Sequence, residues 1–225
     1  MITTILFDLD ETIFDFKKAE AIALKKALLE LGVKPTEEMV KLYSAINEKY
    51  WKLLEQGKLT RQQILVGRFD ELFREIGVDC HGADAKIIYE KNLGTGHYFI
   101  PNALEVLQKL SEKYKLYLVS NGTASVQAGR IESSGIAPLF QEIFISEVVG
   151  YNKPNVEFFN YCFERIPDFK KESTIIVGDS LTSDIRGGNN AGIKTCWFNP
   201  HGKKMTEDVC IDFEIKELTQ LLKML

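Results

Sequence analysis

Residues 100–225 alternate between short apolar runs and amphipathic stretches, and this alternation limits the fold more than any other feature of the sequence. The apolar runs, which we expect to be strands, are residues 115–120, 142–146, 174–179, 194–198 and 211–214. Three of the expected helices cover residues 124–133, 182–191 and 215–224. Two more are expected to begin at Pro101 and at Pro154. Strands joined through helices of this length run parallel, with helices on both faces of one sheet. The sequence therefore predicts an α/β fold.

One more strand, TTILFD at residues 3–8, precedes a long stretch that looks helical from about residue 17 to residue 93. The expected helices are 17–31, 37–56, 61–76 and 84–93. Thr36 is a plausible N-cap, and Thr60 with Gln63 three residues later has the spacing of a capping box. An insertion of this size is too long to be a loop. We therefore predict a core domain formed by 1–14 and 97–225, with an α-helical domain, 15–96, inserted into it.

Polar side chains follow four of the predicted strands, at the point where each strand ends. They are Asp8 and Asp10 in DLDET, Ser120 and Asn121 in VSNG, Lys153 in GYNKPN, and Asp179 and Asp184 in GDSLTSD. Ligands of an open parallel sheet bind beyond the carboxyl ends of its strands. We therefore expect these groups, which are far apart in the sequence, to meet at one edge of the sheet.

This set of groups suits phosphoryl transfer. Oxygen ligands with two or three carboxylates favour Mg²⁺. Ser120, Asn121 and the glycine after them offer donors for a phosphoryl oxygen, and Lys153 adds a positive charge. A carboxylate that faces a neutralised phosphate can attack it and form an aspartyl phosphate, while a second carboxylate two residues away protonates the leaving oxygen.

Each of these motifs has an ordinary explanation when it is taken alone. DLDET fits an acidic strand-to-loop turn, and GDSLTSD fits a turn that leads into a helix. A calcium loop beginning at Asp8 is excluded, because Ile13 stands where such a loop needs Gly and Ala19 where it needs Glu. The motifs favour a catalytic site because all of them occur together, each at the end of a predicted strand.

DLDET, VSNG, Lys153 in GYNKPN and GDSLTSD resemble the four motifs of the haloacid dehalogenase-like hydrolase superfamily. The resemblance implies a Rossmann-like parallel-sheet core with a helical cap inserted after the first strand. Glu11 and Asn155 stand where many relatives have Asp, but neither is a core catalytic position of the family. The family's catalytic machinery is therefore expected to be complete in this chain.

The resemblance also implies a role for each matching residue. The implied catalytic residues are Asp8 as nucleophile, Asp10 as general acid and base, and Ser120 and Lys153, which hold the phosphoryl group. The implied Mg²⁺ ligands are Asp8, Asp10 through its backbone carbonyl, Asp179, and Asp184 as a ligand or as support behind the ligands. The implied phosphate contacts are Thr12, Ser120, Asn121 and Lys153.

A narrower resemblance, to the pyrimidine 5′-nucleotidases of the YjjG type, covers nearly the whole chain. It rests on residues 50–69, 150–159 and 184–200. It implies a small phosphomonoester substrate, a pyrimidine nucleoside monophosphate such as UMP, dUMP or dTMP, including non-canonical ones. The main alternative is a phosphatase for a sugar phosphate or phosphoglycolate. A 2-haloacid dehalogenase is disfavoured by Asp10, and a non-catalytic binding protein by the full motif set.

The sequence does not identify the residues that contact the leaving group of the substrate. Tyr43, Tyr50, Trp51 and Arg68 could contact a nucleobase, although aromatic residues at helical spacing more often pack in a core. Asp15 and Phe16 are candidate hinge residues between the two domains.

Composition excludes several other classes of protein. The net charge of −4 gives no electrostatic reason to bind nucleic acid or an anionic membrane. No apolar run approaches the roughly 20 residues of a membrane span, and the N-terminus lacks the basic region of a signal peptide. We expect a cytoplasmic protein, either a monomer or a homodimer. The cysteines are scattered along the sequence and are expected to be reduced thiols: Cys80, Cys162, Cys196 and Cys210. The histidines are also scattered and are not expected to bind a metal: His81, His97 and His201.

Overall fold

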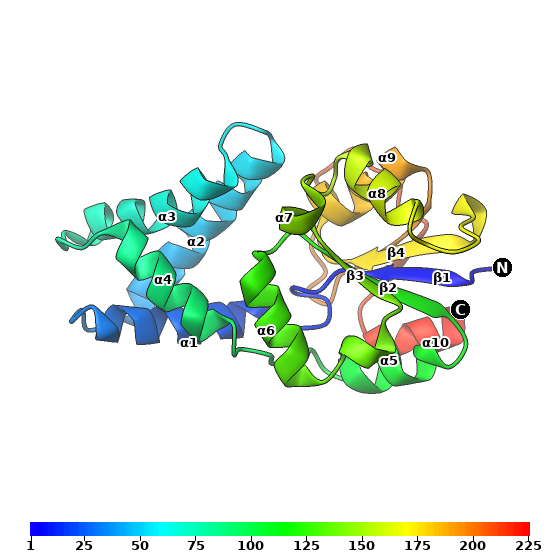
Figure 1. Ribbon diagram of the computed structural model, residues 1–225, viewed down its shortest axis with the longest axis horizontal. Helices are drawn as coiled ribbons and strands as arrows, with labels where there is room; N and C mark the ends of the chain where they lie inside the picture. Colours follow the sequence, from blue (N-terminus) through cyan, green and yellow to red (C-terminus); the bar gives the residue numbers. More distant parts are fainter. The chain divides into compact units, whose positions relative to one another are not determined.

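The computed structural model describes residues 1–225, which form two compact units (Figure 1). Met1–Asp15 and His97–Leu225 make up one of them, which we call the core unit. Phe16–Gly96 make up the other, which we call the helical unit. The chain passes between the units at Asp15–Phe16 and again at Gly96–His97.

The core unit contains one parallel sheet with the order β3-β2-β1-β4-β5-β6. Its strands are β1 (Thr4–Phe7), β2 (Lys115–Ser120), β3 (Glu142–Ile145), β4 (Thr174–Gly178), β5 (Lys194–Phe198) and β6 (Phe213–Ile215). The predicted parallel α/β sheet is confirmed. Because the strand order reverses direction between β1 and β4, the carboxyl end of β1 lies at the position where such sheets bind ligands.

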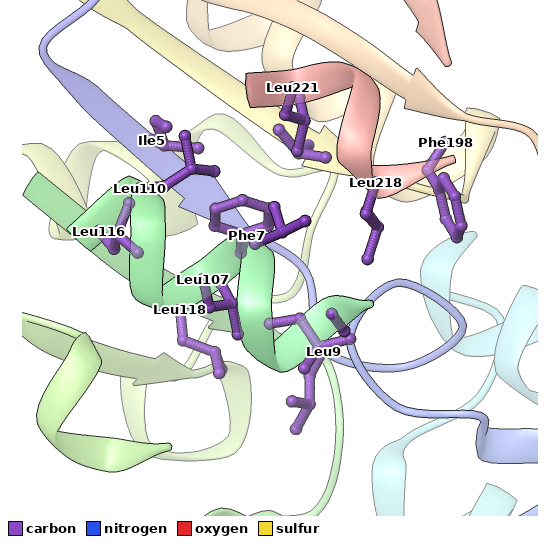
Figure 2. Packing of buried hydrophobic residues seen from close by; sticks show 14 of the residues in the cluster. Ile5, Phe7, Leu9, Leu107, Leu110, Leu116, Leu118, Phe198, Leu218 and Leu221 are labelled. Carbon is purple, nitrogen blue, oxygen red and sulfur yellow. The ribbon is translucent and has the colours of Figure 1, made fainter. Parts of the chain in front are cut away.

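Alternate residues of each central strand face opposite sides of the sheet, and both sides are buried. Ile5 and Phe7 of β1 belong to a cluster with α5 (Ala103–Ser111) and α10 (Leu221–Met224), as Figure 2 shows. Leu6 belongs to a second cluster with residues of α8 (Val156–Phe163) and Ala191 of α9 (Arg186–Ala191). Figure 1 shows α8 and α9 on one side of the sheet and α5 and α10 on the other. Burial on both sides explains why these strands read as continuous apolar runs.

Most expected elements of the core unit are present, but several boundaries were wrong. Pro101 and Pro154 do not open helices, because α5 begins at Ala103 and α8 begins at Val156 after the N-cap Asn155. β3 ends one residue early, where the short α7 (Ser146–Val149) begins. The expected helix 182–191 is a π-helical turn, Leu181–Ile185, followed by α9, and the expected helix 215–224 is a 3-10 turn, Leu218–Gln220, followed by α10. In each case a turn or a cap takes residues that the apolar pattern had assigned to the element.

The helical unit contains four helices at the expected places. They are α1 (Phe16–Glu30), α2 (Glu37–Glu55), α3 (Arg61–Ile76) and α4 (Gly82–Leu93). The Thr36 cap of α2 and the Thr60–Gln63 capping box of α3 are both present. The range of α3 matches the prediction, because its start and stop signals are local, whereas the other three helices differ from their predicted ranges by one or two residues at one or both ends. None of the helices in the structure has the length and apolar character that crossing a membrane requires.

Candidate active site

Asp8 lies directly beyond β1, at the carboxyl end of the sheet. Its backbone N–H donates to the carbonyl of Val177 at 2.9 Å, which continues the pairing of β1 with β4 by one residue. The chain then turns back sharply: Ile13 donates to the carbonyl of Leu9, and both side chains are fully buried. Glu11 takes a left-handed backbone conformation in this turn. The buried apolar residues of the turn therefore anchor the acidic residues between them at the end of β1.

Lys153 joins two carboxylates in the interior of the core unit. Its Nζ donates to Asp8 Oδ1 at 2.6 Å, to Asp184 Oδ1 at 2.6 Å and to the carbonyl of Val119 at 2.9 Å. The Lys153 side chain is only 1% exposed. Burial acts to lower the pKa of Lys153, but the Asp184 and Asp8 carboxylates more than offset it and the pKa is raised. The residue therefore carries a permanent positive charge between two acids.

Asp179 follows β4 and completes a cluster with Asp8 and Asp184. One carboxylate oxygen from each residue lies within 4.8 Å of the others. The sequence prediction required Asp8 and Asp179 to converge, and they do. Burial raises the pKa of Asp179 to about 7, with the Asp184 charge adding to it. Burial is also the largest cause of the raised pKa of Asp8. Three acids held this close need a positive charge beyond that of Lys153 to be ionised together.

The cluster fits a divalent cation with a preference for oxygen ligands. Its donors are carboxylate oxygens without nitrogen or sulfur, which is the ligand chemistry of Mg²⁺. Asp8, Asp179 and Asp184 are the side chains that would hold the ion. Lys203 reaches Asp179 with its Nζ 3.5 Å from Oδ2, and its side chain is half exposed, so it can move away.

Ser180 and Trp197 help to fix two of these acids. Ser180 N–H donates to Asp184 Oδ2 at 3.1 Å, and the Trp197 indole N–H donates to the carbonyl of Asp179 at 2.9 Å. A Cβ at Gly178 would lie 2.3 Å from the Asp184 carboxylate. Glycine is required at this position because the carboxylate occupies the space that a side chain would need.

The phosphate-binding residues expected from the sequence lie around the end of β2 and beside Asp8. Ser120 is 1% exposed, and its Oγ accepts from Gly122 N–H at 3.2 Å. The Asn121 side chain donates to and accepts from the backbone of Lys153, both at 2.9 Å, so it holds the lysine in place. Thr12 is fully buried, and its hydroxyl has no hydrogen-bond partner in the structure.

Asp10 is not one of the three acids of the cluster, and its carboxylate contacts two residues that the sequence analysis did not single out. Arg130 Nη1 donates to Asp10 Oδ1 at 2.5 Å, and Gln127 Nε2 donates to Oδ2 at 2.7 Å. Both belong to α6 (Ala124–Ser134), which follows VSNG. The sequence did carry one signal, which is the spacing of these two residues: they are three positions apart in a helix that follows a site motif, and such residues share a helix face.

The candidate base-contacting residues all lie in the helical unit. Tyr43 and Arg68 are buried, and Arg68 donates to Asn47 at 2.7 Å, which in turn donates to Glu20 at 2.7 Å. Tyr50 and Trp51 are half-buried on α2. Tyr43 and Arg68 are therefore part of the helical unit's own interior.

Comparison with known proteins identifies related chains along the full length. The sequence model of haloacid dehalogenase-like hydrolases matches residues 5–198. HAD-hydrolase YfnB of Bacillus subtilis is 41% identical in sequence, over 99% of this chain and 94% of the YfnB chain. The magnesium-bound structure of YfnB superimposes with a TM-score of 0.95, over 99% of this chain and 98% of the YfnB chain in that structure. The pyrimidine 5′-nucleotidase PynA of Streptococcus pneumoniae is 40% identical over 88% of this chain and 84% of its own. The pyrimidine 5′-nucleotidase YjjG of Escherichia coli is 30% identical over 98% of this chain and 96% of its own.

Proposed function

The chain belongs to the haloacid dehalogenase-like hydrolase family, and we propose that it is a Mg²⁺-dependent 5′-nucleotidase for pyrimidine nucleoside monophosphates. The observation that carries the phosphatase assignment is the joint placement of Asp8, Asp179, Asp184 and Lys153 at the end of the sheet. Mg²⁺ as the cofactor is supported by the donor chemistry of this cluster and by the magnesium-bound relative. The choice of a pyrimidine nucleotide is supported by 40% identity to PynA.

In the first half of the proposed reaction, an Asp8 carboxylate oxygen attacks the phosphorus atom. The new bond joins Asp8 to phosphorus, and the bond from phosphorus to the nucleoside 5′-oxygen breaks. Asp10 gives its proton to that oxygen, so the nucleoside leaves as a neutral alcohol. Mg²⁺ bound to the acidic cluster would supply positive charge that offsets the charge of the phosphoryl oxygens.

In the second half, water attacks the phosphorus of the aspartyl phosphate while Asp10 takes a proton from that water. The bond between phosphorus and the Asp8 oxygen breaks, and its electron pair returns to the carboxylate. Ser120 donates a hydrogen bond to a phosphoryl oxygen in both halves, and the Lys153 ammonium, which already donates to Asp8, Asp184 and the Val119 carbonyl, offsets the phosphoryl charge. The helical unit is proposed as the cap that selects the leaving group and excludes bulk water.

The test is phosphate release from a panel of substrates, measured in Mg²⁺ and again in excess chelator. The panel contains UMP, dUMP, dTMP, purine monophosphates, sugar phosphates, phosphoglycolate and a 2-haloacid monitored for halide. We expect the highest kcat/KM on pyrimidine monophosphates, with activity lost in chelator and restored by Mg²⁺. Preference for a sugar phosphate would overturn the nucleotidase assignment and leave the phosphatase assignment standing. Halide release without Mg²⁺, or no phosphate release from any ester, would overturn both.

A further inference from the structure

Two side chains of α6 occupy the space between Asp10 and the phosphate-binding end of β2. Gln127 and Arg130 are three positions apart, so they lie on the same face of the helix. Gln127 is 2% exposed and Arg130 is fully buried. A buried guanidinium is costly unless a carboxylate and other acceptors surround it. The Asp10 carboxylate is such an acceptor, 2.5 Å from Arg130 Nη1.

The hydrogen bonds of Gln127 leave its amide one possible orientation. Its Nε2 donates to Asp10 Oδ2 at 2.7 Å, and its Oε1 accepts from Arg130 Nη1 at 2.9 Å. The opposite orientation would set the amide oxygen against a carboxylate and the amide N–H₂ group against a guanidinium, which can only donate. Asp10 is therefore held at both carboxylate oxygens by two residues that are also bonded to each other.

Gln127 also fixes the hydrogen-bonding role of the Ser120 hydroxyl. The same Nε2 donates to Ser120 Oγ at 2.9 Å, and Gly122 N–H donates to that oxygen at 3.2 Å. A serine hydroxyl has two acceptor positions and one donor hydrogen. With both acceptor positions in use, the hydroxyl hydrogen can only be donated to an acceptor, and phosphoryl oxygens are acceptors.

Gly122 provides the space for this arrangement. A Cβ at residue 122 would lie 2.2 Å from Gln127 Nε2 and 2.6 Å from Gln127 Cδ. The Gln127 amide thus fills the volume that a side chain at position 122 would occupy. Gly122 therefore has a role here in addition to the donor that it was expected to offer a phosphoryl oxygen.

We propose that Gln127 and Arg130 are positioning residues, which hold Asp10 in line with the leaving oxygen and turn the Ser120 hydroxyl into a donor for the phosphoryl group. This inference rests on the proposed function, because it needs Asp10 to act on the leaving oxygen. Neither residue is assigned a contact with the substrate. They act through Asp10 and Ser120.

The role of Asp10 predicts a dependence on the leaving group. An alkyl phosphate such as a nucleoside monophosphate releases an alkoxide, which needs the Asp10 proton when the bond to phosphorus breaks. 4-Nitrophenyl phosphate releases a phenolate that is stable without that proton. Misplacing Asp10 should therefore slow transfer of the phosphoryl group to Asp8 far more from the alkyl ester than from the nitrophenyl ester, whereas hydrolysis of the aspartyl phosphate is common to both esters. Loss of structure would slow both by the same factor.

The experiment compares kcat and KM on UMP and on 4-nitrophenyl phosphate for wild type, Gln127→Ala and Arg130→Met, all with Mg²⁺. Misplacement of a catalytic group by about 1 Å costs roughly 100-fold in rate. We expect the ratio of kcat/KM on UMP to kcat/KM on 4-nitrophenyl phosphate to fall by about 10- to 100-fold in both variants, because kcat/KM reports the steps up to formation of the aspartyl phosphate. Gln127→Ala should also raise KM for both esters, because Ser120 loses its orientation.

Ser134→Ala is the matched control, since Ser134 is on the same helix and its hydroxyl bonds to the Ile131 carbonyl within that helix. It should leave the ratio unchanged. The ratio is independent of the fraction of protein that is folded, so partial instability of a variant does not obscure the result. An unchanged ratio in both variants, with wild type active on both esters, would overturn this inference and leave the proposed function intact. A wild type without phosphomonoesterase activity would overturn both.

Discussion

Replacing Lys153 by methionine should destabilise the metal-free core unit more than almost any other single substitution. Methionine has a similar length and keeps the packing, but it removes the ammonium that lies 2.6 Å from both Asp8 and Asp184. Removing one partner of a buried ion pair costs about 3–5 kcal/mol, because the other charge is left without compensation. With two carboxylates affected, we expect the upper part of this range. For a chain of this size, that corresponds to a fall in Tm of roughly 10–20 °C.

The effect should depend on pH with a definite sign. The two carboxylates raise the pKa of Lys153 despite its burial, so the ammonium stays charged in the folded protein at pH 5–8. Burial raises the pKa of Asp8, and removing the ammonium raises it further. The variant can therefore neutralise its buried acids by taking up protons as pH falls. The loss of stability should be larger at pH 8 than at pH 5.5, and Mg²⁺ should reduce it at pH 8.

The assay is urea unfolding in chelator, followed by tryptophan fluorescence. The chain has two tryptophans, and Trp197 lies buried in β5 of the core unit while Trp51 lies in the helical unit. A Trp51→Phe background therefore leaves one reporter of core unfolding. The exposed Lys204→Met is the matched control and should change stability by less than about 0.5 kcal/mol. If Lys153→Met were as stable as wild type at pH 8 without metal, the ammonium would not be compensating two buried carboxylates.

Three further predictions test other parts of the molecule. Asp8→Asn should abolish phosphate release and leave the circular dichroism spectrum unchanged. The control is Asp208→Asn, the same change at an exposed acid, which should keep full activity. Substantial turnover by Asp8→Asn would mean that another group is the nucleophile. Because burial raises the pKa of Asp179 to about 7, Mg²⁺ must displace a proton below that pH. Calorimetry should therefore find Mg²⁺ affinity rising about fivefold from pH 6 to 7 and less than about twofold from pH 7 to 8. Equal affinity at pH 6 and 8 would contradict this. Asn47→Leu should destabilise the helical unit by about 1–3 kcal/mol, because it removes the amide that bonds to both Glu20 and Arg68. Urea unfolding followed by Trp51 fluorescence measures this loss of stability. Wild-type stability in the variant would show that the amide bridge contributes nothing.

The parallel sheet and the positions of its strands in the sequence followed from local patterns. Apolar runs bounded by polar residues predicted β2 and β5 with the bounds that the structure has, and the Thr60–Gln63 pair predicted the start of α3. Proline was a poorer guide. Pro101 and Pro154 suggested helix starts, yet each lies in a turn before its helix. A fixed φ suits a turn as well as a first helical turn, so the residue alone does not choose between them.

For the candidate site too, local patterns predicted one part and only the structure showed the other. Parallel strands bring their carboxyl ends to one edge, so a list of the residues after each strand was enough to predict that Asp8, Asp179 and Lys153 meet. The individual contacts were not available from that rule. Lys153 lies between Asp8 and Asp184, and Asn121 holds the Lys153 backbone, because of where the loops after β2 and β3 pack.

What the sequence determined by itself is the α/β core, the helical insertion and the set of residues that can do phosphoryl chemistry. Each depends on neighbours in the chain: residue periodicity, turn and cap signals, and the chemistry carried at strand ends. The tertiary structure alone decided that Gln127 and Arg130, 117 and 120 residues from Asp10 in sequence, bind its carboxylate. The physical reason is that this contact depends on how the face of α6 is turned toward the end of β1, which the packing of the whole core sets and no local pattern records.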